Sequence, residues 1–262
     1  MAAHGALDLA EGDLDDPRHD AGTAALVALA RKTVFTPATL VPDDLAPVVA
    51  AYGQRGALEI VSYVASFHFI NRIADLVGIQ SDVPLVQPQW AWLRRIGVRM
   101  QGWAMGRFLD LSNRDANVDG AVALAEAEAV LGPFPPGYRE LVKAPNVAAF
   151  LTTVADVMRQ LPPELVARVT PVVVTALPAS EDDATGFHAR PSDPIDALAF
   201  VGTRYAARTT DTMTDAVRER YGMDDAALTD LFYAIAMRNA FERMDRLLAA
   251  PLPSGPLDPP NA

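Results

Sequence analysis

The stretch LEIVSYVASFHFINRIADLVGI, residues 58–79, decides how the rest of the chain is interpreted. Apolar residues recur on almost every side of a helix drawn through it: Leu58, Ile60, Val61, Val64, Ala65, Phe67, Phe69, Ile70 and Ile73. A helix that is apolar all round is typical of the buried centre of a fold. We therefore expect a central helix over residues 56–78. Its polar residues become the candidates for function, because unpaired buried polar groups are costly.

The first polar face of this helix carries Glu59, Tyr63 and Ser66, which share one side at 100° per residue. A carboxylate that is desolvated beside a phenol holds a proton at higher pH and so suits acid–base catalysis. One hypothesis is therefore that Glu59 is a general acid or base and that Tyr63 assists it. The alternative is a glutamate near the start of a helix that faces water or pairs with the helix N-terminus.

The opposite face carries His68, Arg72 and Asp75 at positions i, i+4 and i+7, with Asn71 beside them. In one interpretation these residues form a buried cluster of ion pairs that fixes the helix to a neighbour. In the other, Arg72 and Asn71 orient a substrate carboxylate and His68 carries a proton. The two faces cannot serve one pocket on a straight helix, so one of them belongs to packing.

Helical spacing of apolar residues dominates the remaining chain, and the sequence predicts an all-α, multihelical fold. The run Val172–Val174 is the best strand candidate, but its neighbours keep helical spacing. Loops are expected at 132–137 and 178–194. The expected helices cover residues 21–33, 43–53, 56–78, 88–109, 119–131, 146–160, 163–177, 195–207, 213–221 and 225–249.

Two regions have the same order: a helix, a short helix that ends in Tyr-Gly, and a long helix. The dipeptides are Tyr52-Gly53 and Tyr221-Gly222, and within the long helices Arg72 matches Arg243 and Leu76 matches Leu247. We expect two pseudo-repeated units, residues 21–80 and 195–250, joined by a central helical segment. Chance similarity between amphipathic helices in an alanine-rich chain is the alternative.

Composition sets the domain organisation and excludes several classes of partner. The chain has 262 residues, and we expect one helical domain over 21–250, a disordered acidic N-terminus over 1–20 and a disordered proline-rich tail over 251–262. A net charge of −11 argues against binding to nucleic acid or to an anionic membrane. No apolar run is long enough to span a bilayer, and we expect a cytoplasmic protein.

The chain contains no cysteine, which excludes disulfides, thiolate metal sites and a thiol nucleophile. Its four histidines, His4, His19, His68 and His188, lack the spacing of metal ligands. We therefore expect neither a metal site nor a cofactor.

The phrase FINRIADLVG, residues 69–78, resembles the core helix of the alkylhydroperoxidase D-like, or carboxymuconolactone decarboxylase-like, superfamily. The resemblance covers residues 21–80 well and 195–250 more loosely, and it implies a duplicated helical fold and a homo-oligomer, with a dimer as the expected form. The peroxidase branch uses Glu, eleven residues, Cys, two residues, Cys, three residues, His. Aligned on Glu59, this chain has Asn71, Ala74 and Gly78 instead, so thiol peroxidase activity is excluded.

The leading hypothesis is therefore a cofactor-independent lyase, isomerase or hydrolase that acts on a small organic acid. The resemblance implies a lyase similar to carboxymuconolactone decarboxylase as one form of it. Glu59, Tyr63 and His68 would carry the acid–base chemistry, and Asn71 and Arg72 would bind the substrate carboxylate. The alternative is a catalytically inactive relative that binds a ligand or serves a structural or interaction role.

Overall fold

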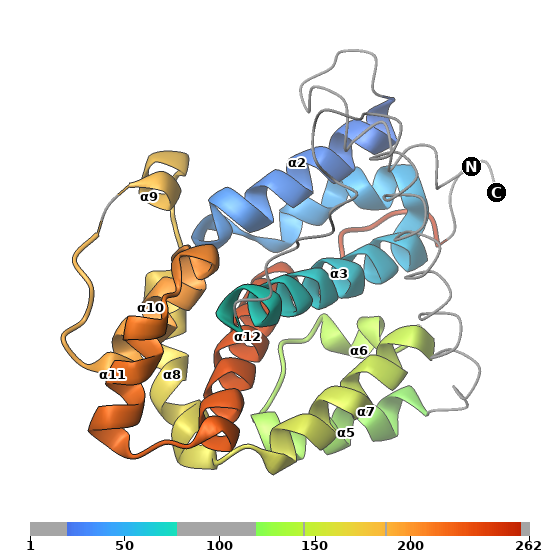
Figure 1. Ribbon diagram of the computed structural model, residues 1–262. Coiled ribbons are helices and arrows are strands. Elements are labelled where there is room, and N and C mark those ends of the chain that lie inside the picture. The colour runs from blue at the N-terminus through green and yellow to red at the C-terminus, as the bar shows by residue number, and fades with distance from the viewer. Residues whose placement is uncertain (1–19, 78–118, 144, 187, 258–262) are drawn as a thin grey trace, which may run out of the picture.

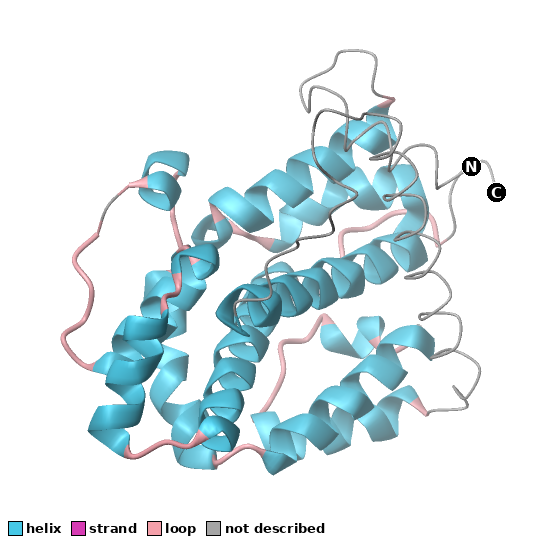
Figure 2. Cartoon of the chain, in the orientation of Figure 1, coloured by secondary structure: helices cyan, strands magenta, loops and turns pink. Residues whose placement is uncertain are grey.

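The computed structural model describes residues 20–77, 119–143, 145–186 and 188–257. All regular structure in these residues is helical, which confirms the expected all-α class (Figure 2). The run Val172–Val174 lies inside a helix. The helices are α2 (Ala21–Phe35), α3 (Ala46–Val77), α5 (Gly120–Leu131), α6 (Tyr138–Leu141), α7 (Pro145–Gln160), α8 (Pro163–Ala176), α9 (Glu181–Thr185), α10 (Pro194–Arg204), α11 (Asp211–Tyr221) and α12 (Asp225–Leu247) (Figure 1).

Helices α3 and α12 pack against each other at the centre of the molecule (Figure 1). Helix α2 covers α3 on one side, α8 and α10 cover α12 on another, and α5 pairs with α7. Most of α12 is buried, from Leu228 to Leu247. Among the described helices, none is both long enough and apolar enough to cross a membrane.

Helix α3 contains the break that the sequence predicts between residues 53 and 56. Gly53 has φ 73° and interrupts the helical backbone, a conformation that glycine adopts without steric cost. The first two N–H groups after the break donate to the C-terminal segment, Gln54 to the carbonyl of Pro256 at 2.8 Å and Arg55 to that of Leu257 at 3.1 Å. Residues 251–257 of the expected disordered tail therefore run beside the start of this half of α3.

The other differences from the expected elements are small. The expected loop 178–194 contains the short helix α9, whose N-cap Ser180 accepts a hydrogen bond from the Asp183 N–H at 3.0 Å. The expected loop 132–137 leads into another short helix, α6. The expected helix 88–109, residues 1–19 of the expected N-terminal tail and residues 258–262 of the expected C-terminal tail lie outside the described residues.

Two separate parts of the chain turn in the same way. Helix α2 ends at Thr36 (φ −134°, ψ 44°) and continues into the 3-10 turn η1 (Pro37–Thr39). Helix α10 ends at Tyr205 (φ −144°, ψ 52°) and continues into the 3-10 turn η4 (Ala206–Arg208). The same number of residues then leads to Gly53 in the first case and to Gly222 in the second. Gly222 has φ 65°, so both glycines lie at positive φ.

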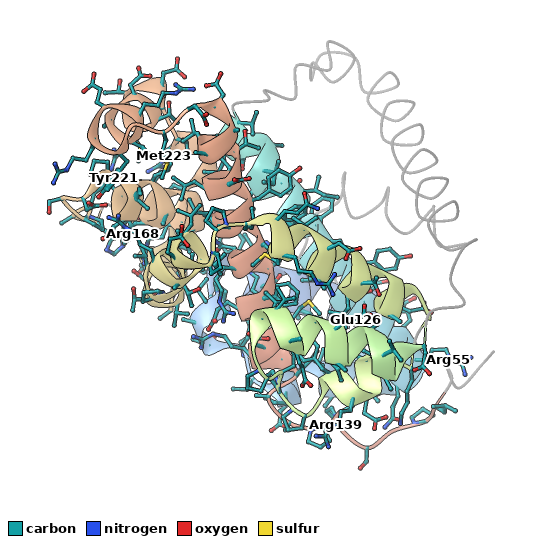
Figure 3. The ribbon with its side chains drawn as sticks, turned by 90° about the horizontal axis from the view of Figure 1, so that it is seen from below. Arg55, Glu126, Arg139, Arg168, Tyr221 and Met223 are labelled. Atoms are coloured by element: carbon teal, nitrogen blue, oxygen red, sulfur yellow. The ribbon has the colours of Figure 1, made fainter. Side chains whose placement is uncertain are left out.

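The tyrosine before each of these glycines lies near the aspartate that caps the first helix of its region, Asp193 of α10 for Tyr221 and Asp20 of α2 for Tyr52. Tyr221 donates from its hydroxyl to Asp193, the N-cap of α10, and accepts a bond of 2.8 Å from Arg168. Arg168 and Tyr221 lie side by side in Figure 3. Burial and the charge of Asp20, the N-cap of α2, raise the pKa of Tyr52.

Candidate functional site

The structure places the two polar faces of α3 on opposite sides of the helix. The Glu59 face lies toward the outside, where Glu59 is half-buried, Tyr63 is 47% exposed and Phe67 is 60% exposed. Ser66 uses its hydroxyl within the helix, where it donates to the carbonyl of Ser62 at 2.9 Å. This face is therefore a surface of α3 with mixed polar and apolar side chains.

The His68 face carries Arg72 toward the helices that pack on α3. Arg72 donates through Nη1 to the carbonyl of Gly202, near the end of α10, at 2.7 Å. Its Nε is buried and has no hydrogen-bond acceptor among the described residues. The expected ion pair with Asp75 is absent from this part of the chain, although the charge of Asp75 favours the charged form of Arg72. Arg72 therefore donates to a carbonyl through Nη1, and its Nε remains a hydrogen-bond donor without a described acceptor.

Arg243 of α12 is the site residue that the sequence analysis did not select. Its side chain is only 1% exposed. Nε donates to the carbonyl of Thr33 near the end of α2 at 2.8 Å, and Nη1 donates to the carbonyl of Asn239 at 2.8 Å and to its Oδ1 at 3.2 Å. Nη2 is buried without a described acceptor. The sequence did contain one indication of its role, because Arg243 matches Arg72 when the regions 21–80 and 195–250 are compared.

His68, Arg72 and Arg243, named here the arginine cluster, lie close enough to shift one another's protonation. Burial, and then the charges of Arg243 and Arg72, hold the pKa of His68 well below its usual range, so the imidazole is neutral at pH 7. Burial lowers the pKa of Arg72 to about 10, which leaves its guanidinium charged at neutral pH. Burial and then the charge of Arg72 lower the pKa of Arg243.

The cluster has an excess of positive charge. Within the described residues, neither Arg72 nor Arg243 forms a hydrogen bond to a carboxylate. Arg204 and Arg238 also have a buried Nε without an acceptor, but each is bonded to a carboxylate, Arg204 to Asp183 and Arg238 to Glu242. A buried donor without an acceptor needs an explanation, such as an unobserved water or ion, and two cationic donors together favour an anion.

Of the five residues proposed from the sequence, the structure brings His68 and Arg72 into this cluster. Asn71 is exposed, and Glu59 and Tyr63 lie on the far face of α3. A straight helix cannot direct all five to one point, as their spacing already indicates. The described residues hold no group of three or more histidine, aspartate or glutamate side chains placed to share a metal ion.

A second, partly buried network lies on another face of α12 and has balanced charge. Arg238 bonds to Glu242 at 2.5 Å and to Asp245 at 3.2 Å, and Arg246 bonds to Glu242 at 3.0 Å. The hydroxyl of Tyr138 donates to Asp245 at 2.9 Å. Two cations face two carboxylates here, so the network is balanced within the protein and needs no ligand.

Comparisons with protein-family models, with curated proteins and with solved structures gave no match.

Proposed function

We propose that this chain binds a small organic acid at the arginine cluster and acts on it by acid–base chemistry without a cofactor. One observation carries the proposal: the buried donors Arg72 Nε and Arg243 Nη2 have no described acceptor, and a half-buried neutral imidazole belongs to the same cluster. Guanidinium groups match the geometry and charge of a carboxylate. An anion would offset the cost of placing the half-buried guanidinium of Arg72 beside the buried one of Arg243.

Each member of the cluster has a role in this proposal. Arg72 and Arg243 hold the carboxylate, one from α3 and one from α12. His68 takes or returns a proton on the bound acid. Burial, and then the charges of Arg243 and Arg72, disfavour the charged imidazole. A bound anion offsets the charge of the arginines, so His68 becomes a stronger base when substrate is present. Glu59, Tyr63 and Asn71 are left outside the site.

A second candidate is a protein that binds or scaffolds without turnover. The observation that favours it is that each arginine ties its own helix to the end of a helix far along the chain, Arg72 to Gly202 and Arg243 to Thr33. Buried charged hydrogen bonds of this kind also fix helices in one arrangement. In that case the cluster is a packing device, and an anion in it would only complete the charge balance.

NMR of the imidazole of His68 separates these candidates. Acetate, propionate and butanoate would be added to the full chain at millimolar concentration, with His68→Gln used to assign the signal. The proposal expects the pKa of His68 to rise on addition of a carboxylate, and Arg72→Met to abolish the rise. An imidazole signal that no carboxylate moves in the intact fold contradicts binding at the cluster. Binding without turnover of any carboxylate supports the second candidate.

We also propose that residues 21–80 and 195–250 are two copies of one helical unit. The matched helix ends at Thr36 and Tyr205 support it, as do the glycines of positive φ. The arginines add a reciprocal contact, because Thr33 and Gly202 hold the same place relative to those helix ends. The spacing from the glycine to the arginine differs by two residues between the copies. Membership of the alkylhydroperoxidase D-like superfamily is proposed on the sequence motif, together with this duplication.

Assembly and location complete the proposal. A homodimer is supported by the outer face of α3, where Tyr63, Phe67 and Ile70 are between 44% and 60% exposed. Sedimentation of the chain with Phe67→Glu tests it, because a charge at the centre of that face should shift the protein toward the monomer. Wild-type protein that sediments only as a monomer contradicts the dimer. We also propose a cytoplasmic location, because the sequence has no cysteine and no apolar run that could span a bilayer. The net charge of −11 supports the proposal that the chain does not bind nucleic acid.

A further inference from the structure

A groove between α2 and α3 is hollowed into a cavity of about 350 Å³. Its floor contains the buried Leu29, and its walls are almost entirely apolar. Arg31, the charged residue at its edge, is engaged with Glu181 at 3.3 Å. The lining residues are Leu26, Val27, Leu29, Ala30, Arg31, Val34, Phe35, Ile60 and Val64. Small-molecule sites have this character, with volumes of roughly 300–1,000 Å³.

His68, Arg72 and Arg243 do not line the groove, but α2 and α3 carry residues of the groove next to residues that belong to, or bind, the arginine cluster. On α3, Val64 is one turn before His68, and residues so spaced are neighbours on a helix surface, with Cβ atoms about 5–6 Å apart. On α2, Val34 follows Thr33, whose carbonyl accepts the bond from Arg243. The lining of the apolar groove therefore comes within one helical turn of His68 on α3 and within one residue of the partner of Arg243 on α2.

We infer that the ligand is an amphipathic monocarboxylic acid, whose apolar body lies in the α2–α3 groove and whose carboxylate meets Arg72 and Arg243. The inference rests on the proposed function, which places the carboxylate at the cluster. Charge complementarity fixes the direction of the ligand, because its charged end must lie toward the guanidinium groups. The volume sets its size, since about 30 Å³ for each water-sized group, the share of one molecule in liquid water, gives room for roughly twelve such groups. Carboxylic acids of about eight to ten carbons fit.

Chain length is the quantity that the groove should control. A fully buried methylene contributes about 0.8 kcal/mol, or about a fourfold change in affinity. The groove is open along one side, so about twofold per methylene is expected. Octanoate has four more methylenes than butanoate and should therefore bind at least about tenfold more tightly. Octan-1-ol has the same tail without the charge and should bind at least about tenfold more weakly than octanoate.

The test is isothermal titration calorimetry of the full chain with butanoate, octanoate and octan-1-ol. Val34 lines the groove and is 49% exposed, so Val34→Trp should narrow the groove without disturbing the core. Val122 is 53% exposed on α5 and provides a matched control, Val122→Trp. Val34→Trp should weaken octanoate about tenfold and leave butanoate unchanged, whereas Val122→Trp should change neither. Arg72→Met, checked for its fold by circular dichroism, should weaken both carboxylates.

The contrary results distinguish a failure of the amphipathic ligand from a failure of the proposed organic-acid site. If butanoate and octanoate bind equally and Arg72→Met weakens both, the organic-acid site stands and the amphipathic ligand is wrong. If octan-1-ol binds as tightly as octanoate and Arg72→Met affects neither, the groove works independently of the cluster and the inference fails. If neither carboxylate binds, the inference and the proposed function fail together. The expected pattern requires both the chain-length dependence and the charge dependence.

Discussion

Helices α3 and α12 cross at the centre of the molecule and each carries an arginine that reaches the end of a distant helix, yet their surroundings differ. Arg243 is enclosed, makes three hydrogen bonds and lies on a helix that is buried for most of its length. Arg72 is half-buried, makes one hydrogen bond within the described residues and lies on a helix whose opposite face exposes Tyr63 and Phe67. The hydrogen bond from arginine to a distant helix end therefore lies in the core for Arg243 and at the edge of the core for Arg72.

The difference in burial and bonding gives the two arginines different roles, a structural one for Arg243 and an adaptable one for Arg72. Arg243 has two of its three nitrogens, Nε and Nη1, engaged and cannot move without leaving buried carbonyls unpaired. Arg72 has fewer bonds to lose and a solvent-reaching edge. If one arginine adjusts to a ligand, it is therefore Arg72, while Arg243 keeps α2 and α12 in place. Experiments that weaken one helix at a time can break or sharpen this contrast.

The largest expected effect is the loss of Arg243. Arg243→Ala empties a buried volume and leaves the carbonyl of Thr33 unpaired, which should lower the free energy of unfolding by about 3–5 kcal/mol. Arg72→Ala should cost about 1–2 kcal/mol, because one hydrogen bond is lost at a half-buried site. Urea unfolding of both variants measures the difference. The double variant should lose less than the sum, since each substitution relieves the other cation.

Equal losses in the two single variants would remove the contrast between the helices. Arg218→Ala serves as a control, because Arg218 pairs at the surface with Asp215 and Asp225, and its stability should match that of the wild type.

The second effect concerns the close approach of α3 and α10 at Gly202. A Cβ there would lie 2.9 Å from a methyl of Leu76 and 3.2 Å from one of Ile235. Gly202→Ala should therefore cost about 1–3 kcal/mol in the same assay, despite the better helix propensity of alanine. Introduced into a Leu76→Ala background, it should cost little, because that change removes the nearest methyl. A cost that persists in that background would assign the loss to the backbone rather than to the contact with α3.

The third effect is a pH dependence specific to His68. Its pKa is lowered in the folded protein, so between the ordinary value of about 6.5 and the folded value the unfolded chain binds more protons. Stability should fall as pH drops through this range, with a contribution from His68 of up to about 1.4 kcal/mol per pH unit. Thermal melts from pH 7.5 to 5.5 should show a shallower slope for His68→Gln. Parallel curves would mean that His68 is not held neutral by the cluster.

The smallest expected effect is that of Glu59→Gln. Glu59 is half-buried beside the exposed Tyr63, and surface changes of this kind stay within about 0.5 kcal/mol. The variant should also bind carboxylates as the wild type does, because Glu59 lies on the far side of α3. A clear loss of carboxylate binding or turnover in Glu59→Gln would return the site to the outer face and contradict the arginine cluster.

The helical class and the break at Gly53 were predictable because apolar spacing and glycine act locally. A helix over residues 58–77 was also predicted correctly, and its two polar faces do lie on opposite sides, but the expected burial on every side was wrong, because Tyr63, Phe67 and Ile70 are exposed. Whether the Glu59 face or the His68 face of α3 is the buried one was not predictable. Both faces carry apolar neighbours, and the outcome depends on which helices from other parts of the chain pack against α3. The expected ion pair of Arg72 with Asp75 gave way to the carbonyl of Gly202, a partner set by the docking of α10.

The burial of Arg243 on α12 was not predictable from the sequence either. A charged helix with Asp230, Arg238, Glu242 and Arg246 predicts a solvated surface, but several of these charges neutralise one another inside the protein. Internal pairing between charges four residues apart allows a polar sequence to be buried. The pattern alone does not distinguish that case from an exposed face.

The contact between Gln54, Arg55 and the carbonyls of Pro256 and Leu257 bears on the order in which the protein forms during synthesis. The ribosome releases residue 55 about 200 residues before the segment that caps it, at roughly 5–20 residues per second. For that interval of ten seconds or more, the second half of α3 has two open N–H groups at its start. Helix α12, in contrast, begins with its own cap, Asp224, which accepts from the N–H of Ala227 at 2.9 Å. The earlier half of the protein therefore reaches its final form only after the later half has been made.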